Sequence, residues 1–197
     1  MKLRHLPVLT VAVAATFAAC GSDDTTSSDP TTATSAAAAT EAALNEADVE
    51  FAQGMIAHHE QAIEMAEIAL DPAVGASAEV VDLATRIQAA QDPEVALMTG
   101  WLDAAGESVT MDTSDGHDMS SMPGMMTADQ MDEMAAMTGA EFDQMWLTMM
   151  IAHHEGAVSQ SETVKADGSN ADVLLLADQI IAAQQAEINE MKALLES

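Results

Sequence analysis

The chain has 197 residues, of which 49% are hydrophobic, and its 33 acidic and 5 basic side chains give a formal net charge of −28. This charge excludes nucleic-acid binding as a default, because contacts to phosphate need lysine and arginine. It instead attracts cations and keeps a protein soluble. Cys20 is the only cysteine, so any metal site in the rest of the chain must use imidazole, thioether or carboxylate ligands.

The first 20 residues predict a bacterial lipoprotein signal peptide. Lys2 and Arg4 precede a short apolar stretch over residues 6–19, and Cys20 follows two alanines directly. The stretch is too short to span a bilayer as a helix, and a cysteine at this place is typical of a lipidation site. The alternative is a plain secretory signal with an incidental cysteine. We therefore expect an extracytoplasmic protein that is anchored to the bacterial cell membrane by lipid on Cys20.

The rest of the chain predicts a tether followed by one helical domain. Residues 21–43 are mainly Ser, Thr, Ala and Asp and lack hydrophobic periodicity, which is typical of a flexible tether. Residues 44–197 are enough for one domain with a sizeable core. Helical periodicity predicts long helices at about 45–70, 77–104, 139–165 and 170–195. Pro93 is expected to kink or break the second of these.

A polar, methionine-rich linker is expected at residues 107–126, between the two pairs of long helices. After it, Thr127 and Gln130 resemble a capping box that begins a short helix ending near Met137. No stretch alternates convincingly as a strand. Two helix pairs joined by a long connection predict an all-α fold in which the pairs pack together as a four-helix bundle.

The chain also repeats itself. The hexapeptide MIAHHE begins at Met55 and again at Met150, and a second shared phrase runs from Leu83 to Met98, including Gln91-x-x-Glu94, and again from Leu176 to Met191, including Gln184-x-x-Glu187. The repeat predicts that the bundle is built from two duplicated helix pairs. The sequence leaves open whether the two copies bring their MIAHHE segments together or hold them at opposite ends.

Each MIAHHE segment places two adjacent histidines one helical turn after a methionine. The candidate metal ligands are Met55, His58, His59, Met150, His153 and His154, with Met65 on the same side as His58. Residues three and four apart are neighbours on a helix, so the sulfur can approach either ring. Thioether is a soft ligand for Cu(I), and imidazole suits both oxidation states of copper. Histidine pairs by themselves would also be compatible with zinc. The alternative to a metal site is that the methionines merely fill the core.

One histidine of each pair is expected to have a structural role. Imidazoles that bind metals commonly donate their other ring N–H to a carboxylate. The carboxylates considered are those of Asp48 and Asp143, or of Glu60 and Glu155. Because four of the six histidines lie in these two pairs, we predict metal binding over simple core packing.

The linker carries a second set of candidate copper ligands. Eight of the 16 methionines lie between residues 111 and 137, and residues 111–126 contain no other large aliphatic or aromatic side chain. Flexible thioethers near an imidazole are suited to Cu(I). The candidates are His117, Met119, Met122, Met125 and Met126. The alternatives are an ordinary linker or a sacrificial target of oxidation, and Met131, Met134 and Met137 have the spacing of a core stripe.

The chain resembles the DUF305 family over residues 45–197 in two phrases, Asp48-x-x-Phe51-x-x-x-Met55-Ile56-x-His58-His59-x-x-Ala62-Ile63-x-Met65-Ala66 and Gln91-x-x-Glu94-Val95-x-x-Met98-x-x-Trp101-Leu102. The resemblance implies a ferritin-like helical bundle and copper binding of the kind found in some copper-resistance proteins of the bacterial envelope. It implies the same six Met and His ligands, with Met65, Met98 and Met191 as further candidates. The second copy departs from the phrase, since Gln160 stands where the first copy has Met65.

The predicted function is that of a copper-binding envelope lipoprotein, without catalytic activity, that sequesters copper or transfers it to or from a partner protein. One alternative is an envelope interaction module that binds no specific metal. A less favoured alternative is a ferritin-like oxidoreductase, whose di-iron site uses a Glu-x-x-His spacing on two helices. No glutamate stands three residues before any histidine in this chain.

Overall fold

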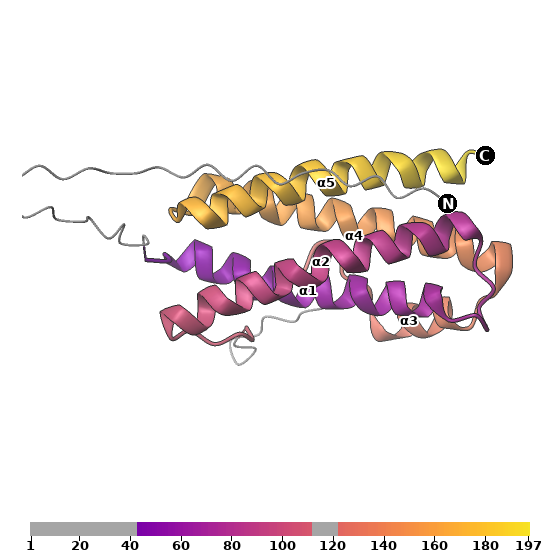
Figure 1. The fold of residues 1–197 in the computed structure, drawn as a ribbon, viewed down its shortest axis with the longest axis horizontal. Helices are drawn as coiled ribbons and strands as arrows, with labels where there is room; N and C mark the ends of the chain where they lie inside the picture. Colours follow the sequence, from indigo (N-terminus) through magenta and orange to yellow (C-terminus); the bar gives the residue numbers. More distant parts are fainter. Residues whose placement is uncertain (1–42, 112–121) are drawn as a thin grey trace, which may run out of the picture. The chain divides into compact units, whose positions relative to one another are not determined.

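A computed structural model of the chain describes residues 43–111 and 122–197 (Figure 1). These residues contain five helices and no strand: α1 (Glu46–Leu70), α2 (Ala78–Ala105), α3 (Ala128–Ala135), α4 (Gly139–Asp167) and α5 (Ala171–Leu195). The all-α prediction is confirmed, and each long helix begins and ends within two residues of its expected bounds. None of the helices in the described ranges is both long and apolar enough to cross a membrane. The predicted signal peptide 1–20, nearly all of the tether 21–43 and linker residues 112–121 lie outside the described residues.

Polar caps set the beginnings of several helices. Before α1, the Asn45 side chain accepts from the Asp48 backbone N–H while the Asp48 carboxylate accepts from the Asn45 N–H, which forms a capping box. Thr127 caps α3 in the same way, as predicted. Asn170 accepts from the first backbone N–H groups of α5. These bonds satisfy amides that have no partner within the helix.

Pro93 lies inside α2, which continues on both sides of it. The expected break is therefore absent. Proline removes one N–H and pushes away the carbonyl of the residue four positions earlier, here Ala89. Both Pro93 and Ala89 are exposed, so water can satisfy the carbonyl that loses its helical partner, and the helix is preserved.

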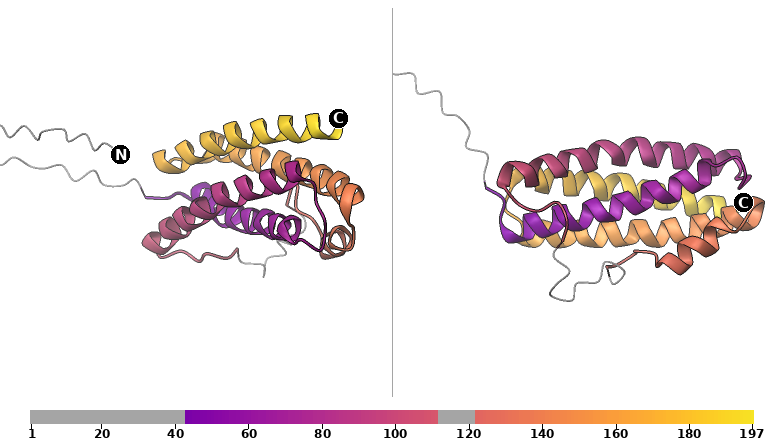
Figure 2. Two further views of the ribbon diagram at one scale, coloured as in Figure 1. Left: turned by 45° about the vertical axis from the view of Figure 1, so that its right-hand side comes forward. Right: turned by 90° about the horizontal axis from the view of Figure 1, so that it is seen from below.

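The long helices pack as two helical hairpins, which contact each other through the first helix of each hairpin. Helix α1 packs against α2, α4 packs against α5, and α1 also packs against α4, with α3 beside α4 (Figures 1 and 2). Asp48 at the start of α1 is fully buried and accepts from the backbone N–H groups of Ser169 and Asn170, each at 3.1 Å. Asp143 in α4 accepts from the Ser77 N–H at 3.1 Å. Each hairpin therefore holds the connecting loop of the other.

The core consists of two apolar clusters. The first contains Met65, Phe142 and Trp146 together with the methionines of α3. The second contains Phe51 and Met98 among smaller residues of the same four long helices. The expectation that Met131, Met134 and Met137 belong to the core is confirmed, since the two α3 methionines are buried in the first cluster and Met137, which follows the helix, packs against it. Burial of these side chains is the main source of stability in a chain with so few ion pairs.

Candidate metal centre

A layer of polar side chains separates the two apolar clusters along the four long helices. On α1, for example, Ile56 belongs to the second cluster and Ala62 to the first, and two histidines lie between them. The members of the layer are His58, His59, Gln91, Glu94, His153, His154, Gln184 and Glu187, two from each helix. We call this set the histidine layer. All four of its histidines are fully buried.

The two MIAHHE segments meet at the centre of this layer. The ring centroids of His58 on α1 and His153 on α4 lie 3.8 Å apart, with the ring planes tilted by 42°. The ring of His154 lies 6.4 Å from that of His153. Of the two arrangements that the sequence leaves open, the fold therefore has the one in which the copies bring their histidines together.

The second histidine of each pair bonds a glutamate on the neighbouring helix. His59 Nε2 lies 2.7 Å from Glu94 Oε2, and His154 Nε2 lies 2.7 Å from Glu187 Oε2. A carboxylate only accepts hydrogen bonds, so Nε2 carries the proton in both histidines. This arrangement leaves the lone pair on Nδ1 and fixes the orientation of the ring, as carboxylates do for histidines that bind metals.

These partners differ from the carboxylates that we expected. Asp48 and Asp143 accept from loop amides instead, Glu60 is exposed, and Glu155 pairs with Lys192 at 3.0 Å. Glu94 and Glu187 escaped the sequence reasoning because they lie far along the chain from the histidines. A signal for them was present, since both stand in the second repeated phrase at the same distance from Gln91 and Gln184.

Several buried nitrogen atoms of the layer have no hydrogen-bond partner among the described residues. They are Nδ1 of His58, His59 and His154 and both ring nitrogens of His153. The Oε1 atoms of Gln91 and Gln184 are also without one. A buried polar atom without a partner costs about 1–3 kcal/mol, and such an atom in a native protein commonly bonds a water or an ion. The layer therefore has the donor atoms that a metal ion would use.

Burial keeps the central imidazoles neutral. The pKa of His58 is lowered to about 3, mainly by burial and also by the neighbouring His59 and His154, against the opposing effect of the Pro123 carbonyl. Burial also lowers the pKa of His153 well below its usual range, helped by His58 and His154 and only weakly opposed by the backbone of His58. A neutral imidazole keeps a lone pair on one nitrogen, and this is the form that binds metals.

Methionine sulfur is the other donor type available near the layer. Met55, Met65 and Met150 are fully buried, as are Met98 and Met191. Within residues 43–111 and 122–197, no three or more His, Cys, Asp and Glu side chains are arranged to hold a metal ion. A metal ion bound at the rings of His58 and His153 would therefore need thioether ligands in addition to imidazole.

Residues 122–126, which we call the strap, cross α1 and α4 beside the histidine layer. His58 Nε2 donates to the Pro123 carbonyl at 3.2 Å. The Gln61 side chain holds Met126 at both backbone groups, since its Nε2 donates to the carbonyl at 2.9 Å and its Oε1 accepts from the N–H at 2.7 Å. On α4, Gly156 gives the strap room, because a Cβ atom there would lie 2.0 Å from the Pro123 oxygen.

The predicted linker ligands are divided by the fold. Met126 is buried in the first apolar cluster, whereas Met122 and Met125 are half-buried. His117 and Met119 lie outside the described residues, as does the predicted lipidation site Cys20. The exposed stretch of thioethers that we expected is therefore partly a segment docked on the bundle.

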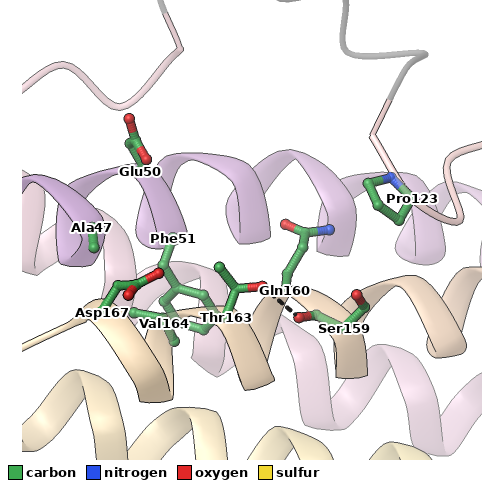
Figure 3. A pocket seen from close by; sticks show the side chains of 9 residues that line it. All are labelled: Ala47, Glu50, Phe51, Pro123, Ser159, Gln160, Thr163, Val164 and Asp167. Carbon is green, nitrogen blue, oxygen red and sulfur yellow. Dashed lines mark hydrogen bonds between the residues drawn. The ribbon is translucent and has the colours of Figure 1, made fainter.

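A cleft of about 290 Å³ lies between α1 and α4 beside the strap (Figure 3). Glu50 and Asp167 lie toward one end of its lining and Pro123 toward the other (Figure 3). Gln160 extends from α4 toward α1 between them (Figure 3). The two carboxylates give the cleft a negative potential, which attracts cations.

Comparisons with known proteins agree with the resemblance in the sequence. Residues 48–195 match the model of the family described as "Domain of unknown function (DUF305)". No curated protein sequence matches the chain. Among solved structures, a candidate secreted DUF305 protein from Streptomyces coelicolor is 30% identical, with a TM-score of 0.70 over 76% of this chain and 92% of the other. A DUF305 fragment from Deinococcus radiodurans is 27% identical, with a TM-score of 0.69 over 78% of this chain and 97% of the fragment.

The protein CopM is also similar. Its Cu(II)-bound structure is 31% identical to this chain, with a TM-score of 0.63 over 76% of this chain and 95% of CopM. CopM has also been solved with Cu(I) bound, with silver bound and in the apo form. The family match covers most of the chain and agrees with the structural similarity, so the chain belongs to the DUF305 family.

Proposed function

We propose that this protein binds copper, without catalysing a reaction, through the histidine layer and the buried methionines beside it. The observation that carries the proposal is the pair of buried, neutral imidazoles of His58 and His153, which face each other at 3.8 Å with ring nitrogens that lack partners. The candidate ligands are Met55, His58, His59, Met65, Met150, His153 and His154.

The proposal includes the duplicated architecture, because the symmetry of the domain creates the site. Residues 44–197 would form a ferritin-like four-helix bundle built from two duplicated helix pairs. Two features support this view. Each half has an equivalent buried histidine–glutamate bond, and Asp48 and Asp143 hold the loops of opposite hairpins.

The donor set favours copper over zinc. Zinc sites in proteins use three or four Cys, His or carboxylate ligands in closed geometry, and the described residues contain no such group of three. Imidazole with thioether is a mixture suited to copper. The copper- and silver-bound structures of the similar protein CopM support the same choice.

We place this activity outside the cytoplasm. The similarity to a candidate secreted protein from Streptomyces coelicolor supports this location, and residues 1–20 supply a signal that would leave lipid on Cys20. A lipid-anchored copper protein would sequester the ion at the membrane or exchange it with a donor or acceptor protein. Mass spectrometry of the N-terminal peptide from the membrane fraction tests the anchor, since an unmodified Cys20 would contradict it.

Competition for Cu(I) against a chromophoric chelator, beside a zinc titration, tests the proposal. The wild-type protein should bind Cu(I) tightly and zinc weakly. A His58→Leu/His153→Leu variant should bind fewer equivalents of Cu(I) than wild type, because leucine keeps the packing and removes the imidazoles. The matched control is Gln91→Leu/Gln184→Leu, which changes two other buried polar residues of the same layer and should still bind copper.

Four results would contradict the proposal. Undiminished Cu(I) binding by the histidine variant would show that the layer does not hold the ion. Equal loss in the glutamine control would show that the layer acts only through the fold. A wild-type protein that fails to compete for Cu(I) would favour an envelope interaction module, and iron-dependent oxidase activity would favour the oxidoreductase alternative.

A further inference from the structure

A second group of donor atoms gathers over Gly54 on α1. A Cβ atom built on Gly54 would lie 3.2 Å from Gln160 Oε1, 3.7 Å from Met122 Sδ and 4.0 Å from Met111 Sδ. Apart from the adjacent residues Gln53 and Met55 and the backbone of α1, these are the nearest atoms. Two thioether sulfurs and one amide oxygen therefore border the space above Gly54.

The two methionines are not accounted for by core packing. Met111 and Met122 are half-buried, and neither belongs to the two apolar clusters or to the residues packed against them. Met111 follows α2 and Met122 begins the strap, so the two sulfurs come from opposite ends of the linker to one place. Methionines are flexible and normally fill gaps in an apolar core. Met111 and Met122 instead border the space above Gly54, beside the amide oxygen of Gln160.

The two copies of the repeat differ at this place. Gly54 corresponds to Met149 in the second copy, and Gln160 corresponds to Met65 in the first. Both of those methionines are buried in the first apolar cluster. The linker sulfurs therefore lie where the repeated helices have no methionine of their own.

We propose that Met111 and Met122 form a second metal site over Gly54, which binds Cu(I), with the Gln160 oxygen beside it. Thioether is a soft ligand that holds Cu(I). Methionine has three rotatable bonds, so the two sulfurs can close on one ion. The proposal rests on the proposed function for the identity of the ion, and it adds a site that selects the reduced state because it contains no imidazole.

The position of the site connects the cleft with the histidine layer. Gln160 lines the cleft, whose Glu50 and Asp167 attract cations from solvent. Gly54 and His58 are four residues apart and therefore neighbours on one face of α1. Pro123, adjacent to Met122, bonds His58. An ion over Gly54 is thus one helical turn from the histidine layer.

Titration of the protein with Cu(I), and with Ag(I) as a redox-inert stand-in, tests the site when the methionine methyl groups carry carbon-13. A Met111→Leu/Met122→Leu variant identifies the two methyl resonances, which should shift in the wild-type spectrum as the ion binds. The same variant should bind one equivalent fewer. A Gly54→Ala variant keeps every donor but fills the space, so its affinity at this site should fall roughly tenfold or more. The control is Gly100→Ala, since Gly100 is exposed on α2 and an added Cβ there meets nothing within 4 Å.

The results separate this inference from the proposed function. If Met111→Leu/Met122→Leu keeps the wild-type stoichiometry and affinity, and the two methyl resonances do not move, the site over Gly54 is refuted whatever the histidine variant does. If His58→Leu/His153→Leu binds as much copper as wild type while Met111→Leu/Met122→Leu loses one equivalent, the histidine site is refuted and the thioether site stands. A wild-type protein that binds no Cu(I) overturns both.

Discussion

Replacement of Gly156 by alanine should destabilise the protein, although alanine is the better helix former. A Cβ atom on Gly156 would lie 2.0 Å from the Pro123 carbonyl oxygen, 2.6 Å from the Pro123 carbonyl carbon and 2.8 Å from the Gly124 Cα. All three are backbone atoms, so a side-chain rotation cannot relieve the clash. The strap must leave α4.

The size of the effect follows from the bonds that hold the strap. Its displacement breaks the His58–Pro123 hydrogen bond and the two bonds between Gln61 and Met126, each of which is worth about 1 kcal/mol. Alanine returns about 1 kcal/mol through its helix propensity. The free energy of unfolding should therefore fall by about 2 kcal/mol, which lowers the melting temperature by about 4–8 °C in a domain of this size.

Thermal and urea unfolding followed by circular dichroism measure this change. The control is Gly100→Ala, in which the same helix propensity is gained without a clash, so the control should be more stable than wild type by up to about 1 kcal/mol. If Gly156→Ala is as stable as Gly100→Ala, the strap does not dock on α4 as described.

Three other predictions follow from the same geometry. A Glu94→Gln/Glu187→Gln variant should fold normally but bind copper about 10- to 100-fold more weakly, because the second imidazoles lose the carboxylates that orient them; chelator competition measures this. In the metal-free protein, the pKa of His58 is about 3 against 6.5 in the unfolded chain. The unfolded chain therefore binds the extra proton, so the contribution of His58 to stability is full above pH 6.5 and falls by about 1.4 kcal/mol per pH unit between pH 6.5 and 3, and His153, whose pKa is also lowered, adds to the loss. Trp146→Phe should cost about 1–3 kcal/mol in urea unfolding, because Trp146 is fully buried and its Nε1 donates to the Met65 carbonyl at 2.9 Å.

A specific result would contradict each of these three predictions. Wild-type copper affinity in the double glutamine variant would show that the carboxylates do not orient metal ligands. For the pH effect, the comparison is His58→Leu, whose stability should depend less steeply on pH between 6.5 and 3; an equal slope would assign the loss to other groups. An unchanged urea midpoint for Trp146→Phe would mean that the indole bond contributes nothing measurable.

Local features of this protein could be predicted because they depend on neighbouring residues in the chain. Hydrophobic periodicity gave the four long helices, and the sequence around Thr127 gave the cap of α3. The repeated MIAHHE segment predicted both histidine pairs as candidate metal ligands, and the structure brings their rings together. The sequence left a kink or a break at Pro93 open, and α2 continues through it, because the effect of a proline depends on whether the carbonyl of Ala89 can reach solvent.

The relations between helices were beyond sequence reasoning. Periodicity shows which face of a helix is buried but not how far one helix is shifted along another. That shift decides that His58 meets His153 and that His59 and His154 bond Glu94 and Glu187. The carboxylates closer in sequence were the natural choice, and they serve other partners.

The strap shows the same division most clearly. The sequence predicts that the strap residues belong to an exposed linker, because no apolar residues close to them in the chain would bury them. Only the tertiary structure shows that the strap lies at positions where the two copies differ, since Gln61, which bonds Met126, corresponds to Gly156, against which Pro123 packs. The sequence alone determined the helices, the repeated phrases and the chemistry of the donor atoms. The tertiary structure decided which donors meet, because contacts between distant segments are set by the packing of whole helices and not by local conformational preference.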